Sequence, residues 1–97
     1  MKNIQEIIRI VSRETGVSAI DIANPSRCGK IILARHLSMW ACRWYTKSSL
    51  QMISAAHGKK SHGTVMNACA SIDAQITYNS RIKSLCEKIV KTIKHLS

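Results

Sequence analysis

Residues 46–72 read TKSSLQMISAAHGKKSHGTVMNACASI, and this stretch decides the fold. Ser48 with Gln51 three positions later is a capping-box pattern, which predicts the start of a short helix over residues 49–57. Gly58 ends that helix, and Ser61 is well suited to cap the next one. Apolar residues then recur at helical spacing: Val65, Ala68, Cys69, Ile72 and Ile76. Two helices joined by a short glycine-containing turn predict a helix–turn–helix.

The rest of the chain also follows a helical pattern, with no Phe, one Pro and no clean alternation at period two. Ile4, Ile7, Ile8 and Val11 form one helix face, and Gly16 ends that helix. Ser18 predicts the cap of a short helix that ends before Pro25. A long helix is expected from Lys30 to Tyr45, and Asn79-Ser80 marks the start of a last one. We therefore predict an all-α fold of five to six helices, forming one domain over residues 1–97.

The composition excludes several classes of protein. Apolar residues make up 45% of the 97 residues and charged residues 21%, which is typical of a globular chain rather than a disordered one. No apolar run approaches the ~18 residues of a membrane span, and no secretory leader is recognised, so we expect a cytoplasmic protein. The cysteines form no C-x-x-C pair, and we expect all four to be small buried hydrophobes: Cys28, Cys42, Cys69 and Cys86.

Enzyme chemistry is not indicated. The chain has no G-x-S-x-G nucleophile motif, no phosphate-binding loop and no paired carboxylates in its basic region. His57 and His62 straddle a glycine-containing turn with no paired thiol nearby, so no metal site is expected. We expect no catalytic residue and no cofactor.

The distribution of charge points to a polyanionic partner. Lys and Arg number 15 against 5 Asp and Glu, for a net charge of +10. Residues 22–72 contain no carboxylate side chain but many basic groups: Arg27, Lys30, Arg35, Arg43, Lys47, Lys59 and Lys60, with His36, His57 and His62. A surface that lies along phosphates must exclude acids, so we predict binding to double-stranded DNA. The alternative at this point is a basic face that is merely solvated.

Several motifs, in a fixed order along the chain, resemble those of a known family. They are Gly16-Val17-Ser18 with Asp21-Ile22, residues 34–40 (ARHLSMW), residues 46–50 (TKSSL) with Ile53, and residues 58–65 (GKKSHGTV) with Ala68-Cys69 and Ile72. With them, the chain from Ile4 to about Leu96 resembles the C-terminal DNA-binding domain of the bacterial replication initiator DnaA. The resemblance implies a compact helical domain with a Trp-repressor-like helix–turn–helix.

The resemblance also implies roles for individual residues. Arg27 would enter the minor groove, with Lys30 supporting it on the backbone. Contacts to phosphates are implied for His36, Arg43, the Ser49-Leu50 helix start and Lys60, and Lys59 adds charge beside them. On the recognition helix, His62 and Thr64 match positions that contact bases or backbone. Arg35 is expected to form a structural hydrogen bond from helix to loop, and five residues are assigned to packing: Met39, Trp40, Val65, Ala68 and Cys69.

Two departures from the family concern base reading. This chain has Ser61 where the family usually has Asp, and Gly63 where it has Thr. Serine discriminates bases less than a carboxylate, and glycine removes a side chain. We therefore expect the binding mode to transfer better than the recognised sequence.

The initiator also carries an ATP-binding domain, which nothing in this chain supplies. The chain is either a fragment of a longer initiator or a free-standing relative, and the altered reading residues with Met1 favour the second. We expect a role in replication initiation or its regulation, with a monomer binding one DNA site. The alternative is a protein-interaction module, such as an initiator antagonist or the partner of a transcriptional regulator. It would keep the fold as a scaffold, with contact through Trp44 and residues 81–94; the basic face of that helix also permits loose binding to anionic lipid.

Overall fold

Six α-helices follow one another in the computed structural model, which describes residues 3–24, 28–59 and 61–95. They are α1 (Ile4–Thr15), α2 (Ala19–Ala23), α3 (Gly29–Tyr45), α4 (Leu50–Ala56), α5 (His62–Tyr78) and α6 (Ser80–His95). No strand occurs in these ranges, so the predicted all-α class and helix number are confirmed. Within the same ranges, no helix is long and apolar enough to cross a bilayer.

The helix boundaries follow from local capping groups. Gly16 ends α1 in the left-handed conformation with φ of 77°, which favours glycine. The Ser18 hydroxyl oxygen accepts the Asp21 N–H at 3.1 Å, and Asn79 Oδ1 accepts the N–H groups of Arg81 and Ile82. These three boundaries match the sequence predictions.

The predicted cap of the fourth helix was displaced by one residue. Ser49, not Ser48, accepts the Met52 N–H at 3.1 Å. The Ser48 N–H donates to the hydroxyl oxygen of Thr46. The Thr46 hydroxyl in turn donates to the Cys42 carbonyl at 2.7 Å. Buried Thr46 thus holds the chain in an extended link after α3, and the helix begins only at the second serine.

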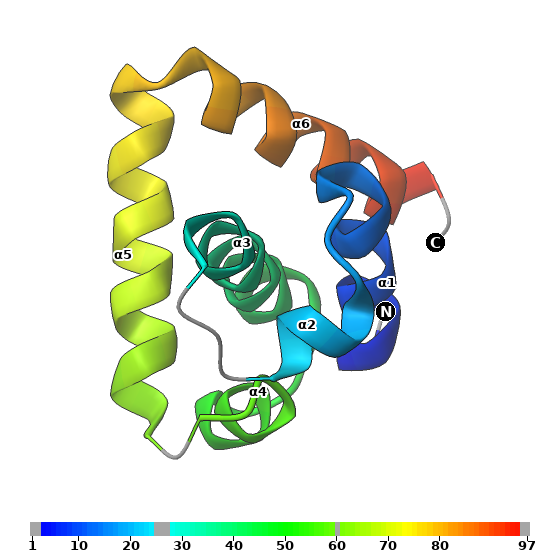
Figure 1. The fold of residues 1–97 in the computed structure, drawn as a ribbon, viewed down its shortest axis with the longest axis vertical. Coiled ribbons are helices and arrows are strands. Elements are labelled where there is room, and N and C mark those ends of the chain that lie inside the picture. Colours follow the sequence, from blue (N-terminus) through cyan, green and yellow to red (C-terminus); the bar gives the residue numbers. More distant parts are fainter. Residues whose placement is uncertain (1–2, 25–27, 60, 96–97) are drawn as a thin grey trace.

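The core surrounds α3. Figure 1 shows α3 near the centre, with α5 on its left, α1 on its right, α6 above it and α4 below it. Fully buried side chains come from all six helices: Ile7 and Val11 of α1, Ile22 of α2, Leu37 and Met39 of α3, Ile53 of α4, Val65 and Ile72 of α5, and Ile89 of α6. The packing roles expected for Met39, Trp40, Val65, Ala68 and Cys69 are confirmed, since all five are buried.

The cysteines divide into two groups. Cys42, Cys69 and Cys86 are buried as expected, and burial raises the pKa of Cys42 to about 12 and that of Cys86 to about 11. The expectation was wrong for Cys28, which is exposed because it precedes the first turn of α3 at the surface.

Arg35 links α2 to α3. Its Nε donates to the Ile22 carbonyl at 3.2 Å, and its Nη2 donates to the Asn24 carbonyl. The guanidinium is thereby buried against the end of α2, which confirms the structural role predicted for this residue.

Candidate nucleic-acid interface

A glycine turn joins α4 to α5. Gly58 has φ of 73°, a conformation that residues with a Cβ rarely adopt. The Lys59 N–H donates to the Ser54 carbonyl at 3.0 Å, and the Gly58 N–H donates to the Ala55 carbonyl at 3.1 Å. This pair of bonds is a Schellman motif, which ends α4 sharply and satisfies its last carbonyls.

A buried serine fixes the start of α5 relative to α4. The Ser54 hydroxyl donates to the Ser61 carbonyl at 2.9 Å, across the turn. Ser61 then caps α5 as predicted, because its hydroxyl oxygen accepts the Gly63 N–H at 3.2 Å. The backbone from which α5 projects is therefore held on both sides of the turn.

His57 does not belong to the basic surface, which corrects its place in the sequence-based set. Its side chain is fully buried, with Nδ1 2.7 Å from the Ile53 carbonyl and Nε2 2.7 Å from the Ser38 hydroxyl. A carbonyl only accepts, so Nδ1 carries the proton and the Ser38 hydroxyl donates to Nε2. Burial lowers the pKa of His57, with the nearby charge of Arg35 adding to the effect, so the ring is neutral and braces α4 against α3.

The first turns of α5 present a polar outer face. Ser61 and His62 are exposed, Gly63 and Thr64 are partly buried, and Val65 is fully buried. The predicted residues 61–64 therefore lie together at the helix start, where the positive end of the helix dipole favours an anion.

Two further residues continue this face and were missed from the sequence. Met66, 47% exposed, and Asn67 follow His62 and Gly63 by one helical turn. Their exposure could have been predicted, because they lie opposite the buried positions Val65, Ala68 and Cys69. An asparagine on this face can read an adenine edge in the major groove.

The middle of α3, which carries Arg35 and His36, lies next to the helix–turn–helix. His36 is half-buried, and its pKa is lowered by burial and then by the positive charges of Arg35 and Lys59. The 2.7 Å hydrogen bond between Ser38 and His57 holds the end of α4, next to the turn, against this part of α3. Ser49, exposed, and half-buried Leu50 begin α4, at the opposite end of this helix from the turn.

Lys30 and Arg43 lie apart from this cluster. They are near opposite ends of α3, about 20 Å apart along its axis at 1.5 Å per residue. Lys30 borders a hollow shared with Glu14, Gln75 and Arg81, at the far end of α5 from its first turn. Arg43 reaches the middle of α5, where burial raises the pKa of the Cys69 thiol and the charge and hydrogen bond of Arg43 oppose that rise. The predicted site residues thus spread along α3 rather than forming one patch.

Arg27 and Lys60 lie outside the described residues. The described residues next to them in the sequence are Cys28, after Arg27, and Lys59 and Ser61, on either side of Lys60.

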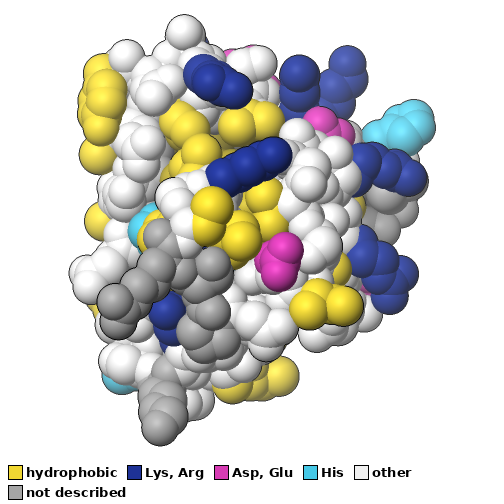
Figure 2. Space-filling model, viewed as in Figure 1, with side chains coloured by type: hydrophobic (Ala, Val, Ile, Leu, Met, Phe, Trp, Pro, Cys, Tyr) yellow, Lys and Arg dark blue, Asp and Glu magenta, His cyan; other side chains and the backbone are white. Residues whose placement is uncertain are grey.

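Carboxylates are absent from residues 28–59 and 61–72, the described part of the basic stretch. The acid that follows, Asp73, accepts the Trp40 indole N–H at 2.9 Å. Figure 2 shows Lys and Arg also gathered over α6 and the side where α1 lies, with few carboxylates among them. The positive field thus extends beyond the helix–turn–helix. In the described part of the chain, no group of three or more His, Cys, Asp or Glu side chains is placed to hold a metal ion.

The turn between α4 and α5 is held by the Ser54–Ser61 hydrogen bond, and the start of α5 is polar and exposed. In a chain of net charge +10, these features are typical of a DNA-binding helix–turn–helix domain. The family model described as the bacterial dnaA protein helix–turn–helix matches residues 4–72. The chain belongs to this family, and the resemblance found in the sequence is confirmed.

The chain is similar to chromosomal replication initiator proteins DnaA from several bacteria. That of Thermotoga maritima is 33% identical over 94 residues, covering 96% of this chain and 21% of the relative. That of Lactobacillus delbrueckii subsp. bulgaricus is 35% identical over 81 residues, covering 84% and 18%, respectively. That of Bacteroides thetaiotaomicron is 26% identical over 91 residues, covering 94% and 19%. The chain therefore spans about one fifth of the length of these relatives.

Proposed function

We propose that this chain binds double-stranded DNA with a preference for sequence, through the helix–turn–helix of α4 and α5. The observation that carries the proposal is the Ser54–Ser61 bond, which holds an exposed, carboxylate-free helix start in a fixed position. An α-helix fits the major groove, and its first residues can reach base edges. In this arrangement Ser61, His62, Gly63 and Thr64 face the bases or the adjoining backbone.

The basic groups around the turn would contact phosphates. Lys59, Lys60, the Ser49-Leu50 helix start and His36 meet the strand next to the recognition helix. Arg43 and Lys30 lie at opposite ends of α3, so each would meet a different segment of backbone. Arg27 would enter the adjacent minor groove, where a narrow groove strengthens the negative potential that attracts a guanidinium.

We further propose a role in the initiation of chromosome replication or in its regulation, because the relatives are named chromosomal replication initiators. The chain would act in the cytoplasm as one domain over residues 1–97, with a monomer on each site. It would have no catalytic activity, since the matched family is a helix–turn–helix family. Ser61 and Gly63 would give it a target sequence different from that of the family members with Asp and Thr there.

Salt-dependent titration tests the proposal. With about five to seven phosphate contacts, the logarithm of the affinity for a duplex should fall against the logarithm of salt with a slope of roughly −4 to −6. Selection from a random duplex pool should then enrich a motif. Failure to bind duplex at low salt would contradict the proposal. Binding without any enriched motif would favour the alternative, a protein-interaction module that keeps the fold as a scaffold.

A further inference from the structure

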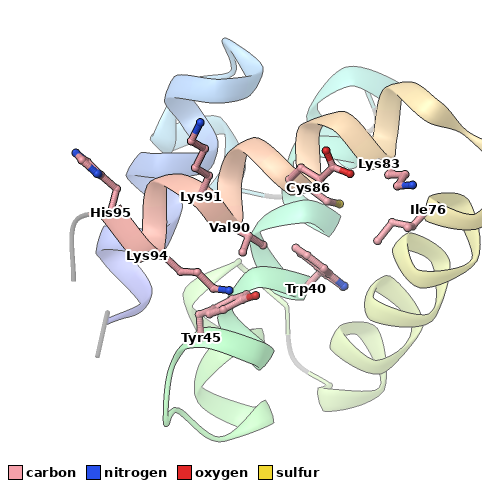
Figure 3. A pocket seen from close by; sticks show the side chains of 10 residues that line it. Trp40, Tyr45, Ile76, Lys83, Cys86, Val90, Lys91, Lys94 and His95 are labelled. Atoms are coloured by element: carbon pink, nitrogen blue, oxygen red, sulfur yellow. The ribbon is translucent and has the colours of Figure 1, made fainter.

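An open groove lies between α6 and the ends of α3 and α5, away from the first turn of α5. Its volume is about 760 Å3. The floor is formed by Trp40 and Tyr45 of α3, Ile76 of α5, and Val90 of α6 (Figure 3). The indole N–H of Trp40 is already bonded to Asp73, so the tryptophan presents apolar ring surface to the groove. The floor is thus suited to apolar side chains rather than to a polar ligand.

One edge of α6 forms a basic rim along this floor. Lys83, Lys91 and Lys94 border the groove with a single carboxylate, Glu87. Figure 3 shows the Lys94 side chain extending toward Tyr45. Lys83 and Lys94 are about 16 Å apart along the helix axis at 1.5 Å per residue, which is three helical turns. The rim therefore matches the length of a short helix laid against the floor.

We propose that this groove binds an amphipathic helix of a partner protein, with an apolar stripe on the floor and acidic residues facing the α6 lysines. Helices that bind in grooves use apolar residues at i, i+3 or i+4, and i+7, and this spacing suits a floor three turns long. The charge of the rim selects an acidic partner and disfavours a second copy, because each copy carries a net charge of +10. The site is separate from the DNA-binding surface, so it does not depend on the proposed DNA function.

Two lysines of α6 provide a matched test of the rim. Lys91 borders the groove, whereas Lys88 lies on the other edge of α6, in the hollow that contains Glu14 and Lys30. Both are exposed, and Lys91→Glu and Lys88→Glu change the net charge equally. Val90→Asp tests the floor, with thermal unfolding of each variant as the control for folding.

The experiment is selection of random 16-residue peptides displayed on yeast against the full chain, with counter-selection against Lys91→Glu. We expect the retained peptides to carry acidic residues and a helical apolar stripe. A synthetic copy should bind Lys91→Glu at least about fivefold more weakly and Lys88→Glu within about twofold of the parent. Val90→Asp should weaken binding at least about tenfold. In a Trp44→Phe background, where Trp40 is the one remaining tryptophan, the peptide should change the fluorescence.

Several results would overturn the proposal. One is no enrichment of peptides, and another is enrichment of peptides that are not acidic. If Lys91→Glu and Lys88→Glu weaken peptide binding equally, the peptide is attracted to the overall charge of the chain rather than to the groove. If Val90→Asp does not fold, the comparison of the two lysine variants still decides. A dimer that Val90→Asp disrupts would assign the groove to a second copy. If the chain binds no peptide but binds anionic vesicles, and this vesicle binding requires Lys91 but not Lys88, the groove would be assigned to lipid.

Discussion

The buried His57 makes a specific prediction about acid stability. The ring is neutral in the folded protein, and burial lowers its pKa below that of an exposed histidine. The unfolded chain therefore binds a proton near pH 6.5 that the folded chain does not, so stability is complete above pH 6.5 and falls below it. The slope from one such group is at most about 1.4 kcal/mol per pH unit, or about 2 kcal/mol between pH 6.5 and 5.

His57→Gln removes this titration and keeps part of the geometry. A glutamine oxygen can still accept from Ser38, but the bond to the Ile53 carbonyl is lost, at a cost of about 1–2 kcal/mol at pH 8. We expect the difference in unfolding free energy between parent and variant to shrink as pH falls from 8 to 5. Half-buried His36 also has a lowered pKa and adds acid sensitivity, but it is present in both proteins.

The assay is urea unfolding monitored by circular dichroism at pH 8, 7, 6 and 5, with His36→Gln as a second variant. Carboxylates titrate equally in parent and variant, so the difference between the two isolates the contribution of His57. A difference that stays constant over this range would refute the assignment of a neutral, buried His57.

The remaining predictions concern the turn and the DNA contacts. Gly58→Ala should destabilise the protein by about 1–2 kcal/mol because φ is 73°, as measured by denaturant unfolding; an unchanged midpoint would contradict the turn geometry. Arg27→Ala should weaken duplex binding by about 1–3 kcal/mol, more on A·T-rich flanks, and equal affinity in anisotropy titrations would exclude the minor-groove role. His62→Ala should reduce the preference for a selected duplex over a random one more than it reduces non-specific binding, whereas an intact preference would count against base reading. Asn67→Ala should reduce affinity for the selected duplex by about 1–3 kcal/mol and leave the random duplex unaffected; an equal effect on both duplexes would mean that Asn67 reads no base.

Local signals in the sequence predicted the helices well. Gly16, Ser18 and Asn79 each act within three or four residues of their own position, and the structure confirms these boundaries. The cap predicted at Ser48 was wrong by one residue: the Ser48 N–H donates to the Thr46 hydroxyl, which donates to the Cys42 carbonyl at the end of α3, and Ser49 caps the helix. Two adjacent serines cannot be ranked as caps without knowing how the preceding helix ends.

The candidate site was harder to predict because its geometry depends on tertiary contacts. His57 carries the same chemistry as His62 in the sequence, yet one is buried against Ser38 and the other is exposed. Lys30 and Arg43 both belong to the basic stretch, but the length of α3 separates them. The apolar groove beside α6 combines residues from α3, α5 and α6, and no local pattern in the sequence indicates it.

The most direct test of the central claim is an NMR titration of the 15N-labelled chain with a duplex selected from a random pool. The account predicts that the largest amide shift changes fall at residues 59–64 and 67 and at residues 27–30, with smaller changes in α6. Changes concentrated in residues 81–94, with residues 59–64 unaffected, would contradict the placement of the first turn of α5 against DNA.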